Sequence, residues 1–526
     1  MASSGSKMVR HSLKMMAGTF LSRILGLARE ILIAAFFGAS GRLDAFLVAY
    51  TLANLSRRLL AEGALSAAFV PVFSQSLKRR GLQKADRLAR ETFTFLLGAA
   101  GLFVAVGIVL APWLVAFLAP GFSGENALLA TTLTRTMLPF MLFISVAALA
   151  MGILNSMGCF FVPAVAPAVS NVVFILLVLI LAPAAGIDSL AVAVLAGGVS
   201  QCLLQWLWTK RYGVTLLPVV PDLKNRELRR VMGLFLPYAA GLSLNQLIPV
   251  FSRVLGSFLQ EGSISVLNYA DRILQLPLGL FVIAISQAIL PLLARQVLEG
   301  EDAFRRGIED ALRFAMFIVL PVTAGLLLFS TEMVHLLFVR GAFGEWAWRA
   351  TSTTLAMFAL GLPGMASMNV LLRALHARGL PREAMYVAAS SVATYFAFGV
   401  LLMQPLAYAG LALGASCSFT TSALFAGLLL RRRCGLASPF TASWIKPVAG
   451  GVAVMTAAVW VLKIVLPYPE KMNILLRAGW ICLPIALGAV VYAAVTWKAG
   501  CGEWEWLREV FQRKGLPEEG RENKED

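Results

Sequence analysis

Charged residues interrupt two long apolar stretches near the N-terminus, where a membrane-spanning segment would carry few charges. They are Arg23, Arg29 and Glu30 in the first stretch, Asp44 at the start of the second, and Arg57, Arg58 and Glu62 further along it. On insertion scales one charge at the bilayer centre costs about 2.5–3.5 kcal/mol. Four arginines would therefore cost on the order of 10 kcal/mol unless water, a partner or a ligand meets them.

The positions along the first stretch bring cations and an anion together. On an ideal helix Arg23 and Glu30, seven residues apart, share a face, and Arg29 lies about a third of a turn away. Gly26 lies between the two arginines and would permit a bend that turns both toward one cavity. A structural alternative is that Arg23 pairs with Glu30.

The second stretch offers a similar choice. Arg58 and Glu62 are spaced i, i+4 and can pair on a helix, so that these residues and Arg57 could form a structural clamp. For the set as a whole, cations outnumber nearby carboxylates. Arginine stays charged at any depth, and its planar fork matches phosphate oxygens in pairs. We therefore predict that a compact, multiply charged diphosphate binds there.

A further charged group occurs in the second half of the chain, in the run Asn268-Tyr-Ala-Asp-Arg272. Asp271 and Arg272 fall inside an expected helix, with Gln275 one turn beyond. These three residues are further candidate site residues, in the second half of the chain.

Composition places these groups in a polytopic helical membrane protein. The 526 residues are 59% hydrophobic and 14% charged, against about 25% charged in a soluble protein. Apolar runs near 20 residues long, enough to cross about 30 Å of hydrocarbon, recur along the chain. We expect an all-α fold with about 14 transmembrane helices, over 12–37, 44–73, 91–118, 131–155, 161–183, 189–209, 229–259, 264–294, 309–329, 350–375, 383–403, 406–430, 444–466 and 474–497.

Loop charge predicts the orientation. Lys and Arg gather in alternate connections, and cytoplasmic loops are the ones enriched in them. Arg340, Lys463 and Lys471 are exceptions. This bias, together with an even helix count, predicts that both termini are cytoplasmic. It also accounts for the net charge of +17 without a nucleic-acid partner, for which no binding module is visible.

An internal repeat at an offset of about 220 residues predicts two parallel six-helix lobes around a central cavity. Ala68-Phe-Val-Pro71 recurs as Ala288-Ile-Leu-Pro291. The predicted division is an N-terminal lobe, 1–220, a C-terminal lobe, 221–433, two additional helices, 434–499, and a cytoplasmic tail, 500–526. Trp504, Trp506, Leu507 and Phe511 are expected to form a short interfacial helix in that tail.

Motifs for chemistry and metal binding are missing from the sequence. There is no HExxH, GxSxG or Walker A motif, so we predict neither an enzyme nor an ATP-driven pump. The three histidines are dispersed and the six cysteines form no CxxC pair, which predicts ordinary buried thiols, no metal site and no cofactor. Asp and Glu suitable for a sodium site are also missing from the expected seventh helix and from the interior of the expected eleventh helix, and the coupling ion stays open.

Three runs resemble the MurJ (MviN) family of lipid II flippases, which belongs to the MOP superfamily. They are SRILGLARE from Ser22, NLSRRLLAEGALSAAFVP from Asn54 and YADRILQLPLG from Tyr269. The resemblance implies transport of lipid II, an undecaprenyl-diphosphate disaccharide-pentapeptide, from the cytoplasmic to the periplasmic leaflet of the bacterial inner membrane. It also implies that the last two helices form a groove for the lipid tail, and that cell-wall synthesis enzymes are potential partners.

The resemblance further implies roles for single residues. Family positions matching Arg23, Arg29, Arg57 and Arg272 line the cavity and contact substrate, and Asp44 matches a functionally important acidic position. The chain departs from the family at Glu30, commonly Asp, and at Gln275, Glu in some members. Our leading expectation is alternating access, in which Arg23, Arg29 and Arg272 hold the diphosphate while Arg57 and Arg58 draw it in or gate the cytoplasmic side.

Three other functions remain open. A flippase for another undecaprenyl-diphosphate oligosaccharide would need the same arginines. A MATE-like exporter of organic cations would need carboxylates in its cavity instead. A membrane scaffold that recruits cell-wall enzymes would translocate nothing.

Overall fold

The computed structural model describes residues 4–59, 65–222, 224–243, 246–506 and 508, and over these the chain contains helices and no strand. The predicted all-α membrane class is thereby confirmed. Contacts divide the chain into two compact units. The first comprises Met1–Tyr269 with Phe338–Trp348, and the second Ala270–Leu337 with Arg349–Asp526. The division into two six-helix lobes that the repeat predicts stays a prediction.

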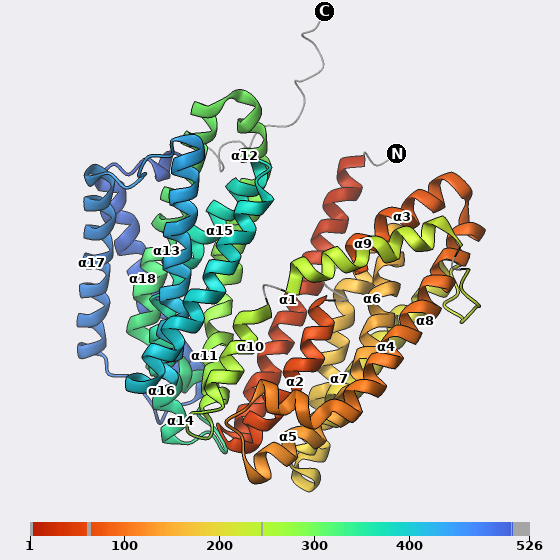
Figure 1. The fold of residues 1–526 in the computed structure, drawn as a ribbon. Coiled ribbons are helices and arrows are strands. Elements are labelled where there is room, and N and C mark those ends of the chain that lie inside the picture. The colour runs from red at the N-terminus through yellow and green to blue at the C-terminus, as the bar shows by residue number, and fades with distance from the viewer. Residues whose placement is uncertain (1–3, 60–64, 223, 244–245, 507, 509–526) are drawn as a thin grey trace, which may run out of the picture. The chain divides into compact units, whose positions relative to one another are not determined.

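The first unit is a bundle in which α1 packs on α7, α7 on α8, and α6 on α3, α4 and α8, while α2 packs on α5 (Figure 1). Its helices are α1 Ser4–Phe37, α2 Gly41–Leu59, α3 Leu65–Arg80, α4 Leu82–Leu118, α5 Gly124–Met137, α6 Phe140–Ser156, α7 Phe161–Ala185, α8 Asp188–Arg211, α9 Arg226–Ser243, α10 Leu247–Gly256 and the first half of α11 Ser263–Pro277.

Several predicted boundaries differ from these helices for identifiable reasons. The helix predicted over 131–155 is divided into α5 and α6 at Pro139, because proline has no N–H to continue the helical ladder. The helix predicted over 91–118 begins at Leu82, since its first turns are polar and invisible to hydropathy. The one predicted over 44–73 corresponds to α2 and α3, with residues 60–64 outside the described part of the chain.

The second unit takes in the rest of α11 and the helices that follow it. In it α15 packs on α16, α17 on α18 and α12 on α15. These elements are a π-helical stretch η3 Leu278–Ile283, α12 Ala284–Glu299, α13 Glu301–Phe338, α14 Glu345–Ala359, α15 Leu362–Ala377, α16 Pro381–Cys434, α17 Ala442–Val465 and α18 Ile474–Lys498. The π turn directly follows Pro277, whose missing N–H disturbs the α-helical pattern.

The two helices predicted over 383–403 and 406–430 form the single long element α16. It is kinked at Ala407, where φ is 48° and ψ is −128°. Positive φ is uncommon for a residue with a Cβ, and Pro405 lies two positions earlier. The predicted division is therefore present as a kink rather than a loop.

Nine helices of the described chain, or ten when α14 and α15, bent by 42°, count as one span, are long and apolar enough to cross a bilayer. This makes the protein a multi-pass membrane protein. The count of 14 stays a prediction. α1 and α2 are not among the nine, and they carry Arg23, Arg29, Glu30, Asp44, Arg57 and Arg58.

The cysteines and the tail modify two expectations. All six cysteines are free thiols: three are buried as expected, Cys159 and Cys417 are half-buried, and Cys482 on α18 is exposed. The tail turns back at residues 503–506, which are helical. Trp504 donates to Thr496 Oγ1 at 3.1 Å and packs edge-on against Phe317, so it contacts protein rather than the bilayer interface alone. Leu507 and Phe511 lie outside the described residues.

Candidate functional site

An ion pair lies at the centre of the candidate site, on α1 in the first unit. Arg29 Nη2 donates to Glu30 Oε1 at 2.9 Å, and the two side chains are 18% and 5% exposed. Neighbouring residues on a helix point about 100° apart, so the long side chain of Arg29 has to turn back to reach Glu30. Glu30 thus balances the charge of Arg29, and the alternative pairing of Glu30 with Arg23 is not found.

Helix α7 fixes the Arg29 guanidinium from the other side. Arg29 Nη1 donates to Asn171 Oδ1 at 3.4 Å, and Asn171 Nδ2 donates to the backbone oxygen of Ser22 at 3.2 Å. One turn further along α7, the ring centroid of Phe174 lies 5.2 Å from the guanidinium carbon. A cation over an aromatic face is attracted to it, so the guanidinium is held by a carboxylate, an amide and a ring.

Glu30 is connected in turn to α11 and α10. Asn268 Nδ2 donates to Glu30 Oε2 at 3.3 Å, and Arg253 Nη2 donates to Asn268 Oδ1 at 3.4 Å. Arg253 Nη1 also donates to the carbonyl of Ile264 at 3.2 Å. A polar chain therefore links four helices, α7, α1, α11 and α10, through groups that would each be costly to bury alone.

Asp44, at the start of α2, holds the beginning of α11. Its Oδ2 accepts from the N–H of Gly262 at 2.7 Å, and its Oδ1 accepts from the N–H and the hydroxyl of Ser265 at 2.7 and 2.6 Å. Helix N-termini present unpaired N–H groups and a positive dipole end, which a carboxylate satisfies. We call this arrangement of Asp44, Gly262 and Ser265 the Asp44 latch.

Further short contacts surround the latch. The Tyr269 hydroxyl donates to the carbonyl of Gly38 at 3.0 Å, and the N–H of Ala342 donates to the carbonyl of Ala35 at 2.8 Å. Gly38 has φ of 59°, and a Cβ there would lie 2.4 Å from the Ala342 oxygen. Only glycine meets both demands at position 38. The segments 35–44, 257–269 and 341–343 are thus closed tightly on one another.

The remaining charged residues of the first unit are more dispersed. Arg23 is exposed on α1, and the structure gives it no ion pair or hydrogen bond with the described residues. Arg57 Nε donates to Asn54 Oδ1 at 3.1 Å. The side chain of Arg58 and the whole of Glu62 lie outside the described part of the structure, so the predicted Arg58–Glu62 pair is not described either.

Three predicted residues belong to the second unit. Gln275 Nε2 donates to Asp271 Oδ2 at 2.5 Å, one turn apart on α11. Arg272 is half-buried on the same helix. Within the described ranges, no group of three or more His, Cys, Asp or Glu side chains is placed to hold a metal ion.

Comparison with known proteins decides the family. The family model described as "Lipid II flippase MurJ" matches residues 33–476. A protein from Rhizobium meliloti, "Probable lipid II flippase MurJ", is 32% identical over 509 residues, covering 94% of either chain. The chain belongs to the MurJ lipid II flippase family. A Burkholderia cenocepacia relative, "Lipid II flippase MurJ", is 32% identical over 438 residues, 81% of this chain and 84% of its own.

Solved structures share the MurJ fold. One entitled "Lipid II flippase MurJ, inward closed conformation" aligns with a TM-score of 0.77 at 24% identity, over 95% of this chain and 99% of that one. A multidrug resistance MATE family transporter of the MOP superfamily, in an inward-facing conformation, aligns with a TM-score of 0.69 at 18% identity, over 82% and 98%. The fold is therefore common to MurJ and MATE transporters.

Three polar residues of this MurJ family member escaped the sequence analysis. Asn171, Asn268 and Arg253 each occur in a predicted helix, as Arg29 does, but none of them was predicted to belong to the site. Arg253 could have been found, since it is a further arginine inside an apolar run. The asparagines are uncharged and give little signal, because their role depends on which helix packs against which.

Proposed function

We propose that this MurJ family protein moves lipid II from the cytoplasmic to the periplasmic leaflet by alternating access. In this proposal the diphosphate of the lipid enters a polar cavity lined by arginines, while the undecaprenyl tail stays in the bilayer. The protein would act in the bacterial inner membrane with both termini in the cytoplasm, as the loop charges predict. It would be a transporter without catalytic residues or a bound cofactor.

The observation that supports this proposal best is the state of Arg29. Its charge is balanced by Glu30, yet its Nε is buried and has no hydrogen-bond partner among the described residues. A buried donor left without a partner costs about 1–3 kcal/mol. A diphosphate offers several oxygens and can bind such a guanidinium at two points. It would therefore compete with Glu30 for Arg29 and supply the acceptor that Nε lacks.

With its hydrogen bonds formed, the Asp44 latch would close the periplasmic end of the protein. Loop charge predicts that residues 38–44 and 257–262 face the periplasm. With this end closed, substrate would enter from the cytoplasm, and release would require the three hydrogen bonds to Asp44 to break. Because the carboxylate leaves a helix N-terminus, breaking them is costly, and substrate binding would have to offset that cost.

The other predicted residues fit around this core. Arg272, which is half-buried on α11, would also contact the diphosphate, as the family resemblance implies. Asp271 and Gln275 would orient that turn. Arg57 and Arg58 would draw the diphosphate in or gate the cytoplasmic side, and Glu62 would support them. α17 and α18 would provide the groove for the tail.

Complementation tests the proposal. In cells depleted of their own flippase, the unaltered chain should restore growth, and Arg23→Ala or Arg29→Ala should not, at equal membrane levels of protein. Arg295→Ala serves as a matched control, because Arg295 is 81% exposed and pairs with Glu299 one turn away. Normal growth with Arg29→Ala would contradict the assigned role.

Purified protein separates the alternatives. Native mass spectrometry with lipid II and with another undecaprenyl-diphosphate oligosaccharide shows which of the two substrates the protein binds more tightly, and so compares the two flippase hypotheses directly. Translocation of lipid II in reconstituted vesicles then distinguishes a flippase from a scaffold, which would bind without moving the lipid. Transport of an organic cation instead of lipid II would favour the MATE-like reading.

A further inference from the structure

The segment between α8 and α9 packs against the helices of the first unit. It covers residues 212–225, of which the structure describes all but residue 223, and it is not helical. Val214 and Leu216 are buried, at 0% and 1% exposure, so the chain presents alternate apolar residues to the bundle. Such burial is unusual for a flexible connection, which normally runs over the surface.

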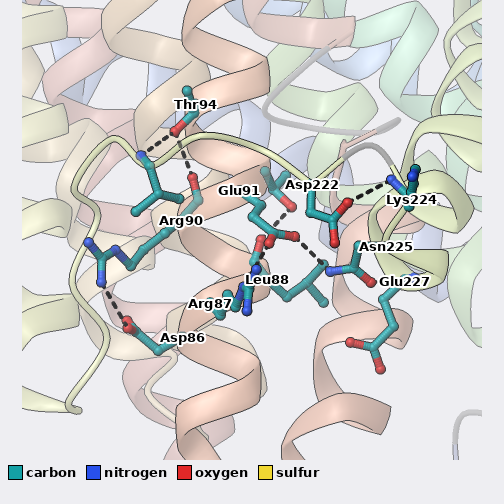
Figure 2. A network of polar contacts seen from close by, with 12 residues as sticks. Asp86, Arg87, Leu88, Arg90, Glu91, Thr94, Asp222, Lys224, Asn225 and Glu227 are labelled. Carbon is teal, nitrogen blue, oxygen red and sulfur yellow. Dashed lines mark hydrogen bonds and ion pairs between the residues drawn. The ribbon is translucent and has the colours of Figure 1, made fainter.

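Side chains of α4 bind this segment at regular intervals, because the spacing of the side chains on the helix matches the spacing of their partners on the segment. Asp86, Arg90 and Thr94 lie four residues apart, so one face of α4 presents a group about every 6 Å. Their contacts on the segment lie two residues apart, about 6.6 Å in an extended chain. The hydrogen bonds are Thr215 N to Asp86 Oδ1 at 2.8 Å, Arg90 Nε to Leu217 O at 3.5 Å and Val219 N to Thr94 Oγ1 at 2.9 Å. Figure 2 shows the three α4 side chains along their helix.

Glu91 holds the end of the segment. It is 1% exposed; its Oε1 accepts from Arg87 Nε at 3.0 Å and its Oε2 accepts from Asn225 Nδ2 at 2.6 Å (Figure 2). Asn225 Oδ1 in turn accepts from the N–H of Glu227 at 3.0 Å, in the first turn of α9. Asn225 therefore caps α9 while its amide group is fixed to α4 by Glu91.

Helix α9 is tied to α3 at the same place. Glu227 Oε2 accepts from the Ser76 hydroxyl at 3.1 Å, and Arg80 Nη1 lies 3.5 Å from Glu227 Oε1. Arg230 Nη1 donates to Gln75 Oε1 at 3.0 Å. The start of α9 is thus connected to two helices of the first unit by neutral and charged groups.

We propose that residues 214–222, 224 and 225, which we call the strut, stay docked on α4 throughout the transport cycle. This inference rests on the proposed function, since it concerns how that cycle moves the chain. Glu91 is the positioning residue: acting through Asn225, it makes the start of α9 move with α3 and α4. The bending that alternating access requires then occurs beyond Arg230, and not in the connection between the two repeats.

A reversible crosslink tests whether the strut stays docked. Thr94→Cys and Val219→Cys are introduced after the six native cysteines are replaced, because Thr94 Oγ1 lies 2.9 Å from the Val219 nitrogen. In vesicles, oxidised protein should flip lipid II at no less than half the rate of the reduced protein. A loss of more than tenfold that is reversed by reduction would overturn the proposal.

A second crosslink separates this inference from the proposed function. Ala35→Cys with Ala342→Cys joins the segments beside the Asp44 latch, which the proposed function requires to part. Oxidation of that pair should stop flipping, and reduction should restore it. If the reduced forms of both pairs fail to flip lipid II, the proposed function fails. If only the oxidised Thr94–Val219 pair fails, the strut is wrong and the proposed function stands.

Two variants test Glu91 from either side of its contact. Glu91→Gln keeps the shape of the side chain and removes its charge. Asn225→Asp still caps α9 but sets a second carboxylate against Glu91, so the contact should be lost. Both should lower flipping at least tenfold and raise hydrogen exchange in residues 214–219, at equal protein levels.

The control for these variants is Asp222→Asn. Asp222 Oδ1 accepts from the N–H of Lys224 within the segment itself, and its loss should leave both rate and exchange within twofold of the parent. Faster exchange with unchanged flipping in Asn225→Asp would show that docking is dispensable and overturn the proposal. Unchanged exchange would show equally that Glu91 does not hold the segment.

Discussion

Asp44 accepts two hydrogen bonds from Ser265, one from its N–H and one from its hydroxyl, although the two residues are 221 positions apart in the chain. The carboxylate is 2% exposed and also accepts from the N–H of Gly262. It occupies the place of a capping side chain at the start of α11, but it is supplied by α2. A capping side chain supplied by another helix satisfies the N–H groups at the start of α11 and also connects α11 to α2.

Asp44→Asn should loosen this tie. Asparagine keeps one acceptor oxygen but carries an amide that cannot accept from an N–H. Hydrogen bonds to charged groups contribute about 1.5–3 kcal/mol, so the ratio of closed to open protein should fall on the order of tenfold or more. The measurement is the rate of disulfide formation between Ala35→Cys and Ala342→Cys.

The control for the latch is Arg42→Ala. Arg42 and Glu125 pair at 3.4 Å with side chains 71% and 79% exposed, and an exposed pair contributes little. Its loss should not change the crosslinking rate. If Asp44→Asn crosslinks as fast as its parent, Asp44 does not hold this end closed.

The second prediction concerns the chemistry of Arg29. Arg29→Lys keeps the charge but loses the planar fork that binds a diphosphate at two points. It should reduce lipid II binding in native mass spectrometry at least tenfold, and Arg29→Ala should reduce it further. Glu30→Gln removes the competing carboxylate without removing the cation, and should not weaken binding. Equal binding by Arg29→Lys and the parent would refute the bidentate role.

The third prediction compares two glycines of the first unit. A Cβ at Gly121 would lie 2.3 Å from the carbonyl oxygen of Ser257, whereas one at Gly101 on α4 would meet nothing within 4 Å. Gly121→Ala should lower stability by about 1–3 kcal/mol through overpacking, seen as a lower unfolding temperature in detergent. Gly101→Ala should be neutral or stabilising by up to about 1 kcal/mol. Similar unfolding temperatures for the two variants would contradict the close approach.

The fourth prediction concerns the second unit, where Lys463 Nζ lies 2.7 Å from Glu332 Oε1 and donates to the Leu328 carbonyl at 2.5 Å. Glu332 is 9% exposed. Removing one partner of a buried pair costs about 3–5 kcal/mol, so Lys463→Met should lower the unfolding temperature clearly. Adding Glu332→Gln should recover most of the loss, since no charge then stays buried. A double variant as unstable as the single one would argue against the pair.

Lys463 also shows how sequence and structure complement each other. Loop charge predicted an orientation to which Lys463 was an exception, and the structure explains the exception as a local ion pair with Glu332. The helical class and most spans followed from apolar runs, because these reflect the bilayer directly. Helix ends that lie outside the apolar runs, such as Leu82 of α4 and Glu301 of α13, could not be predicted from hydropathy.

The details of the site were harder to predict for a physical reason. The seven-residue spacing left open a pairing of Glu30 with Arg23, but Glu30 pairs with Arg29, its direct neighbour. Spacing along one helix favours i, i+3 and i, i+4 pairs. It cannot include Asn171 and Asn268, which come from other helices and hold Arg29 and Glu30 together.

The most direct measurement of the central claim is lipid II translocation by purified protein carrying Ala35→Cys and Ala342→Cys, reconstituted in vesicles. The two residues are joined by a 2.8 Å backbone hydrogen bond beside the Asp44 latch. Alternating access predicts that oxidation stops translocation while lipid II still binds, and that reduction restores the original rate. Translocation that continues at an unchanged rate in the oxidised protein would contradict the account.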